Sequence, residues 1–351
     1  MVILPLIISI FTFFGLYLIL SISFNLEFGY AGQPNFGKVL LYGIGATCAG
    51  RLVATIVMWY VGADVPFFSA LAADMRLRWG AESPLATAGL FVLALVVAMV
   101  VGGAIGYLLS YPTLRLSGDF LAIVMICAGE IFRIFLKTYE PLAGGPFGLS
   151  GVPGPFSFVP DPHLKETLYM LLVLAIAFGC YFFAQKLVNS PYGRLLKAVR
   201  DDELAANVLG KRVVRVKAEI LTIGSAMAAL AGALYAFYIR GVYAEDFVPM
   251  VTFTAVTMTM LGGLANNQGV LLGCLILTLF DRLTRASFFN MLGIRVAFDI
   301  SYIRYTIMGL LIILIVMFRP KGLMPEEPVK TPAIEMAEEK LAKRAEESTS
   351  P

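Results

Sequence analysis

Charged side chains are scarce in this sequence: only 15% of its 351 residues are Asp, Glu, Lys or Arg, while 59% are hydrophobic. Soluble domains average about 25% charged and about 45–50% apolar residues, so the composition excludes an ordinary water-soluble domain. The mean hydropathy of +0.81 agrees with that conclusion. A net charge of +3 is also too small and too scattered for nucleic-acid binding, which requires a basic stripe.

Cysteine and histidine are scarce too, with four Cys and one His in the chain. Each Cys falls in a different apolar stretch and has no neighbour at the spacing of a metal or redox site. We therefore expect Cys48, Cys127, Cys180 and Cys274 to be small core residues. We expect no metal site, no other cofactor and no catalytic residue.

Long stretches without any charge are abundant. The longest cover residues 1–26, 83–114, 167–185, 220–239 and 247–280. A helix needs about 20 apolar residues to cross the hydrocarbon core, so we predict an all-α, polytopic integral membrane protein with about 8–10 membrane-spanning helices. The first stretch has no basic leader and no small-residue cleavage motif, and we expect it to remain as a span.

The spans are predicted near residues 2–22, 39–60, 85–111, 118–137, 166–187, 218–240, 249–263, 268–284 and 301–318. The loop 188–217 carries seven basic and three acidic residues, which places it in the cytoplasm by the positive-inside rule. Counting crossings from there puts the N-terminus and the turn-rich loop 138–165 outside. The transmembrane domain would cover 1–319 and a charged cytoplasmic tail 320–351. Residues 24–50 and 247–280 could instead be broken or re-entrant segments that do not cross the membrane. Because one crossing more or less reverses every upstream segment, the orientation of the N-terminus stays open.

Residues 190–210 have the pattern of two short cytoplasmic helices. Ser190 followed by Pro191 is typical of a helix start. Asp201 or Asp202 would cap the second helix, which would end near a glycine, Gly210.

The second of these helices would present a small apolar face, with Leu204 beside Val208 and Ala205 beside Leu209. Such a face suits a groove on a partner protein, whereas an ordinary charged loop is the simpler interpretation.

Residues 190–210 resemble the cytoplasmic coupling loop of ABC importer permeases, specifically of the branched-chain amino-acid permease family. Four further segments resemble that family, in its order: FGYAGQPNFGKVLLYGIG (28–45), LRLSGDFLAIVMICAGEIFR (114–133), GGPFGLSGVP (144–153) and MLGGLANNQGVLLG (260–273). Together these segments span most of residues 25–320. Two positions depart from the family pattern: the general importer motif places Glu where Leu204 stands, and Gln33-Pro34-Asn35 replaces the more usual Gln-Leu-Ser.

The resemblance implies a plasma-membrane subunit of an ATP-driven importer that works by alternating access. Its partners would be a second homologous permease, two cytoplasmic ABC ATPases and an extracytoplasmic solute-binding protein that delivers branched-chain or other apolar amino acids. The chain itself would not be an enzyme. Residues 32–38 do match the Walker A spacing, but Val39 stands where a Ser or Thr is required.

The resemblance also implies which residues carry transport. The coupling loop would act through Gly193, Arg194, Glu203, Ala205, Ala206 and Gly210. The candidate translocation path consists of small and polar residues from two glycine-rich segments: Gly29, Gly32, Gln33, Asn35, Gly262, Gly263 and Asn266. In the first segment the glycines indicate either close helix packing or a broken helix that lines a polar cavity. In the second we predict a broken helix.

Glu130 and Arg133 lie three residues apart in a predicted span, and we expect them to form an ion pair on one helix face. Two alternatives to the importer of amino acids stay open. A urea or short-chain amide permease would share the same motifs. A stand-alone secondary transporter would need coupling-ion residues buried mid-span, and the sequence has few.

Overall fold

The computed structural model describes residues 3–62, 65–113, 118–284, 300–319 and 321–326. Within these ranges most residues are helical, and the strands are a short antiparallel pair, β1 (Leu149–Ser150) and β2 (Gly241–Val242). The prediction of an all-α protein is confirmed.

The long and short helices follow one another in chain order, with π- and 3-10 turns marked η. They are α1 (Ile3–Phe24), η1 (Asn25–Tyr30), α2 (Lys38–Val61), α3 (Ala70–Glu82), α4 (Pro84–Thr113), α5 (Gly118–Thr138), α6 (Glu140–Ala143), η2 (Gly145–Phe147), α7 (Pro162–Asn189), α8 (Pro191–Asp201), α9 (Glu203–Val208), α10 (Val213–Ile239), η3 (Ala244–Asp246), α11 (Met250–Gly262), α12 (Asn267–Leu283) and α14 (Ile300–Phe318). Each predicted span coincides with one of these helices. In the described part of the chain, five segments are long and apolar enough to cross a membrane: Leu4–Tyr30, Lys38–Val61, Pro84–Tyr111, Pro162–Asn189 and Val213–Ile239.

The core of the bundle is α10, which packs against both α2 and α4. A Cβ atom on Gly45 of α2 would lie 2.0 Å from the carbonyl oxygen of Ala229. A Cβ on Gly232 of α10 would lie 1.8 Å from the carbonyl oxygen of Tyr42. The two helices therefore touch backbone to backbone, which is the close-packing role of small residues in membrane bundles.

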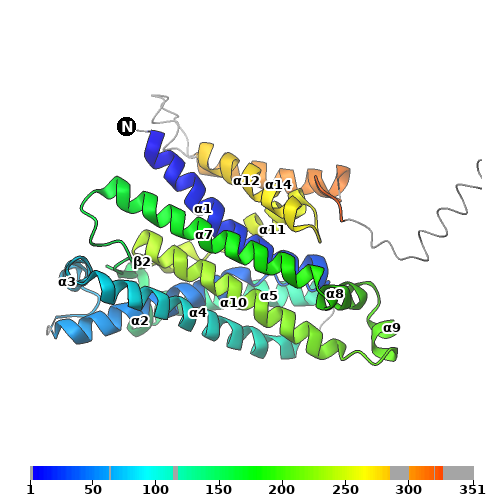
Figure 1. Ribbon diagram of the computed structural model, residues 1–351, viewed down its shortest axis with the longest axis horizontal. Coiled ribbons are helices and arrows are strands. Elements are labelled where there is room, and N and C mark those ends of the chain that lie inside the picture. Colours follow the sequence, from blue (N-terminus) through cyan, green and yellow to red (C-terminus); the bar gives the residue numbers. More distant parts are fainter. Residues whose placement is uncertain (1–2, 63–64, 114–117, 285–299, 320, 327–351) are drawn as a thin grey trace, which may run out of the picture.

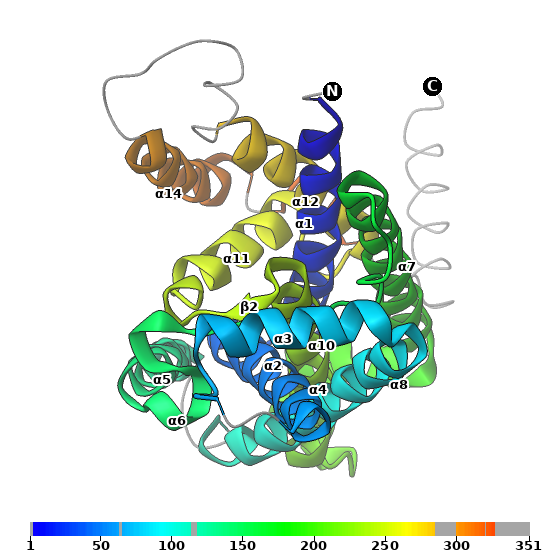
Figure 2. The ribbon, with the colours of Figure 1, turned by 90° about the vertical axis from the view of Figure 1, so that its left-hand side faces the viewer.

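Helix α3 was not expected from the sequence. Ser69 caps it by accepting a hydrogen bond from the amide of Ala72, and the helix lies across one end of the bundle (Figure 2). The buried Arg76 of α3 donates to the carbonyl oxygens of Phe67 and Ser150. Burial, and then the nearby guanidinium of Arg51, lowers the pKa of Arg76 to about 10. These bonds fasten α3 to the short sheet.

The cysteines occupy different environments. Cys274 is buried, as expected, whereas Cys48 and Cys180 are partly exposed. Cys127 is exposed, so the expectation of a core position is wrong for this residue. The reason is that α5 turns an apolar face, including Ile123 and Ile131, away from the bundle.

The two ends of the bundle differ. Figure 1 shows α8 and α9 together at one end, and α3 and β2 at the other. Most of the predicted tail, residues 327–351, lies outside the described residues. Its first part, 321–326, packs against the bundle, since the amide of Leu323 donates to the carbonyl oxygen of Leu261.

Candidate coupling and transport site

Residues 190–210 form two short helices at the end of the bundle, as predicted. The side chain of Ser190 accepts a hydrogen bond from the amide of Tyr192, and Pro191 is the first residue of α8. Asp202, one of the two proposed caps, accepts bonds of 2.9 Å from the amides of Leu204 and Ala205. Helix α9 ends at Val208, shortly before Gly210 with its φ of +75°.

The exposed face of α9 is apolar. Leu204 and Val208 are 80% and 87% exposed, and Leu209, just after the helix, is 77% exposed. Ala206 is only 4% exposed and points into the bundle instead. Large apolar side chains held outward by a capped helix are typical of a protein-binding surface. Of the predicted coupling residues, Ala206 therefore lies on the buried side of α9, whereas Ala205 lies on its exposed side.

Two of the remaining predicted coupling residues, Gly193 and Glu203, contact neighbouring helices, whereas Arg194 is exposed to solvent. A Cβ on Gly193 would lie 1.8 Å from the carbonyl oxygen of Val188, so only glycine fits the sharp turn from α7 into α8. Glu203 forms an ion pair with Lys217, which links α9 to α10. Arg194 is exposed. A cavity of about 750 Å³ adjoins α9, between Asn207 and the ends of α4 and α10.

The first glycine-rich segment meets this end of the bundle. The first helix does not stop near residue 22: it continues to Phe24 and into the π-turn η1, and the chain is then non-helical until Lys38. Nη1 of Arg200 in α8 donates a 2.8 Å hydrogen bond to the carbonyl oxygen of Gly29. A Cβ on Gly32 would lie 3.1 Å from Cγ of Arg200. The interruption of the first helix thus lies against α8, in the predicted coupling loop.

The second glycine-rich segment breaks the helix between α11 and α12, as predicted. Gly263 has a φ of +120°, and Asn266 caps α12 by accepting from the amides of Gln268 and Gly269. The 13 residues of α11 extend about 20 Å at about 1.5 Å per residue. That is about two thirds of the about 30 Å of a hydrocarbon core, so α11 alone is too short to cross it.

A polar network joins the two glycine-rich segments. Nδ2 of Asn25 donates to Oδ1 of Asn267 at 3.0 Å, and Oδ1 of Asn25 accepts from the amide of Ala265 at 2.9 Å. Nδ2 of Asn267 in turn donates to Oε1 of Gln185 on α7. A cavity of about 140 Å³ lies here, bordered also by Asn266. This volume is below the about 300–1,000 Å³ of typical ligand pockets.

Of the candidate path residues, only Asn266 borders this cavity. Gly29 lies against the turn that contains Gly262, Gly263 and Asn266, because a Cβ on Gly29 would lie 2.6 Å from the amide nitrogen of Ala265. Gln33 and Asn35 are buried beside the start of α2 and do not border the cavity. Oδ1 of Asn35 accepts from the amide of Gly37.

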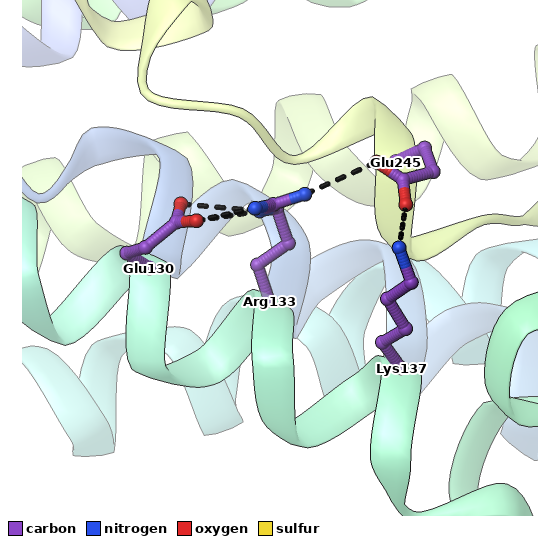
Figure 3. Close-up of polar contacts among 4 residues, drawn as sticks. All are labelled: Glu130, Arg133, Lys137 and Glu245. Atoms are coloured by element: carbon purple, nitrogen blue, oxygen red, sulfur yellow. Dashed lines mark hydrogen bonds and ion pairs between the residues drawn. The ribbon is translucent and has the colours of Figure 1, made fainter.

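Glu130 and Arg133 form the expected ion pair in the C-terminal half of α5. This pair belongs to a larger cluster of charged side chains (Figure 3). Arg133 also donates to Oε2 of Glu245 in η3 at 3.0 Å, and Lys137 pairs with the same carboxylate. Two cations therefore face two carboxylates. The cluster fastens α5 to the loop between α10 and α11.

Comparison with known proteins identifies the family. A family model for the permease component of branched-chain amino acid transport systems matches residues 6–316. The chain belongs to this family. No solved structure matches it.

Curated relatives of this permease agree with the family. It is 33% identical over 327 residues to the probable branched-chain amino acid transport permease protein LivM of Methanocaldococcus jannaschii, covering 92% of this chain and 94% of that protein. It is 30% identical to the high-affinity LivM of Salmonella typhimurium, covering 67% of this chain but only 57% of that relative. The high-affinity LivH of Escherichia coli is 27% identical, with 77% and 82% covered. The resemblance inferred from the five sequence segments is confirmed, and the permease is a membrane protein.

A buried ion pair in this permease was not expected from the sequence. Nζ of Lys38 lies 2.7 Å from Oε1 of Glu27, and both side chains are 0% exposed. Gly224 of α10 makes room for it, since a Cβ there would lie 2.0 Å from the same Oε1. The sequence does carry a signal: Glu27 ends the uncharged run 1–26, and Lys38 lies inside the first glycine-rich segment, 28–45. An ionisable residue inside a membrane-spanning segment is a functional flag by default.

Proposed function

We propose that this permease is a membrane-spanning subunit of an ATP-driven ABC importer for branched-chain or other apolar amino acids, acting by alternating access. The observation that carries the proposal is the exposed apolar face of α9, formed by Leu204 and Val208 on a capped helix. This face would dock into a groove of a cytoplasmic ABC ATPase. ATP hydrolysis would then reside in two such partners and not in this chain.

The charge distribution supports the orientation. The seven basic residues of 188–217 gather around α8 and α9, and an excess of Lys and Arg marks the cytoplasmic side. The opposite end, with α3 and the short sheet, would face outward from the plasma membrane. There Phe147 of η2 is 88% exposed, and residues 144–155 around it would contact the solute-binding protein.

Alternating access would involve the broken helices. The proposed path residues are Gly29, Gly32, Gln33, Asn35, Gly262, Gly263 and Asn266. Four of them meet where the interrupted first helix and the α11–α12 turn touch, and this contact would act as a cytoplasmic gate. The rest of the path would be completed by a second, homologous permease. Alanine at Asn266 or Gln33 should change the KM or the rate of uptake, and unchanged kinetics would remove these residues from the path.

The proposal is tested by gentle purification of the tagged chain from its native membrane, followed by mass spectrometry. Recovery of a second permease and of ATPase subunits is expected, and a partner-free chain would instead indicate a stand-alone transporter. Uptake of labelled leucine against labelled urea then separates the amino-acid importer from a urea permease.

A further inference from the structure

Residues 321–326, which follow α14, return to the α11–α12 turn and bind it through the backbone. The amides of Leu323 and Met324 donate to the carbonyl oxygens of Leu261 and Gly262, both at 2.9 Å. The approach is so close that a Cβ on Gly263 would lie 2.1 Å from the carbonyl oxygen of Met324. Residues 321–326 and the turn therefore have to move together.

The same segment holds the coupling helix α8. One oxygen of Glu326 lies 2.7 Å from Nζ of Lys197, and the other lies 2.8 Å from Nη1 of Arg200. All three side chains are only about a quarter exposed or less, so solvent screens these pairs less than it screens fully exposed ones. Arg200 also binds the carbonyl oxygen of Gly29. Glu326 thus joins α8 to the α11–α12 turn, while Arg200 joins α8 to the interrupted first helix.

We propose that residues 321–326 form a coupling strap, in which Glu326 is the positioning residue that carries movement of α8 to the α11–α12 turn. The inference rests on the proposed importer function and adds the route by which the coupling loop reaches the gate. When an ATPase displaces α8 and α9, Lys197 and Arg200 pull on Glu326, and the two backbone hydrogen bonds pass that displacement to Leu261 and Gly262. Without the carboxylate the ATPases would still dock on α9, but the turn would no longer follow.

The test uses the complex purified with its own ATPases and reconstituted in vesicles, where ATP hydrolysis and labelled leucine uptake are measured in the same preparation. Glu326→Gln should keep ATP hydrolysis within about twofold and lower uptake per ATP by about twofold to thirtyfold, the range of coupling changes produced by single substitutions. Asp74→Asn is the matched control, because it removes an exposed ion pair with Arg78 on α3 at the other end of the bundle. It should leave both activities unchanged.

Glu326→Asp tests whether the carboxylate itself carries coupling. It keeps a carboxylate opposite both Lys197 and Arg200, so its uptake per ATP should be higher than that of Glu326→Gln. Wild-type uptake per ATP in Glu326→Gln would overturn the proposal. Loss of both Glu326 variants from the membrane would also overturn the proposal, because residues 321–326 would then be needed only for folding. Failure of the importer function itself would show differently, as a wild-type chain without ATPases or without ATP-dependent uptake.

Discussion

Glu27 and Lys38 depend on each other, because both side chains are fully buried and their charged atoms lie 2.7 Å apart. Lys38→Met would leave a buried carboxylate without its partner. Removing one member of a buried ion pair costs about 3–5 kcal/mol, whereas replacing both with apolar residues is often neutral. We therefore expect Lys38→Met to lower the unfolding temperature of the detergent-purified chain markedly, and Glu27→Met/Lys38→Met to recover most of it. Equal losses in the single and double variants would contradict this account.

The carboxylate of Glu245 gives the outer cluster a pH dependence. A hydrogen bond from Lys137, then the charges of Lys137 and Arg133, lowers the pKa of Glu245 below its ordinary value of 4.5. Its pairing therefore stabilises the fold above that ordinary value and is lost as the pH falls through the lowered pKa. Glu245→Gln should lower the unfolding temperature at pH 7, and this difference should shrink as the pH falls through the lowered pKa. A difference between variant and wild type that stays constant as the pH is lowered would show that the carboxylate acts otherwise.

At the scale of single elements, a substitution on the exposed face of α9 can impair docking of a partner without impairing folding. Leu204→Asp places a charge on an 80% exposed side chain, so the helix should still form. The apolar face would be lost, and we expect severalfold less ATPase to co-purify with the chain. Phe147→Asp is the control, since Phe147 is equally exposed at the other end of the bundle. It should retain the ATPases and weaken binding of the solute-binding protein, whereas equal ATPase loss in both variants would argue against α9 as the docking site.

The elements that the sequence predicts well are those specified locally. Uncharged stretches of membrane length are helical, and Ser190 and Asp202 cap α8 and α9. Helix α11 ends at the glycine pair 262 and 263. Their signals lie within a few residues of the structure they determine. The burial of Ala206 was not predictable in this way, since it depends on which side of α9 meets the rest of the bundle.

Contacts between distant segments were beyond the sequence pattern. Asn25 and Asn267 are hydrogen-bonded although they are 242 positions apart, and Arg200 reaches Glu326 across 126 positions. Neither residue of such a pair carries a local sign of its partner. Helix α3 was missed for a related reason: its 13 residues are too short and too polar for a span, and they are recognisable mainly through Arg76 and its contacts with other segments.

At the scale of the whole molecule, the segments that we propose to move during transport lie together at one end of the bundle. The interrupted first helix, the α11–α12 turn, α8 and the segment 321–326 all meet there, next to the exposed face of α9. The other end is fastened by α3, the short sheet and the cluster around Arg133. Under the proposed function, the gate at this end would be moved by ATPases that dock beside it on α9.

The most direct measurement is uptake of labelled leucine into vesicles that contain the purified complex, with ATP supplied on the side of α8 and α9 and the solute-binding protein on the other. The account predicts uptake that requires ATP and persists when ion gradients are collapsed. Uptake that needs no ATP and stops when the ion gradient is removed would contradict it.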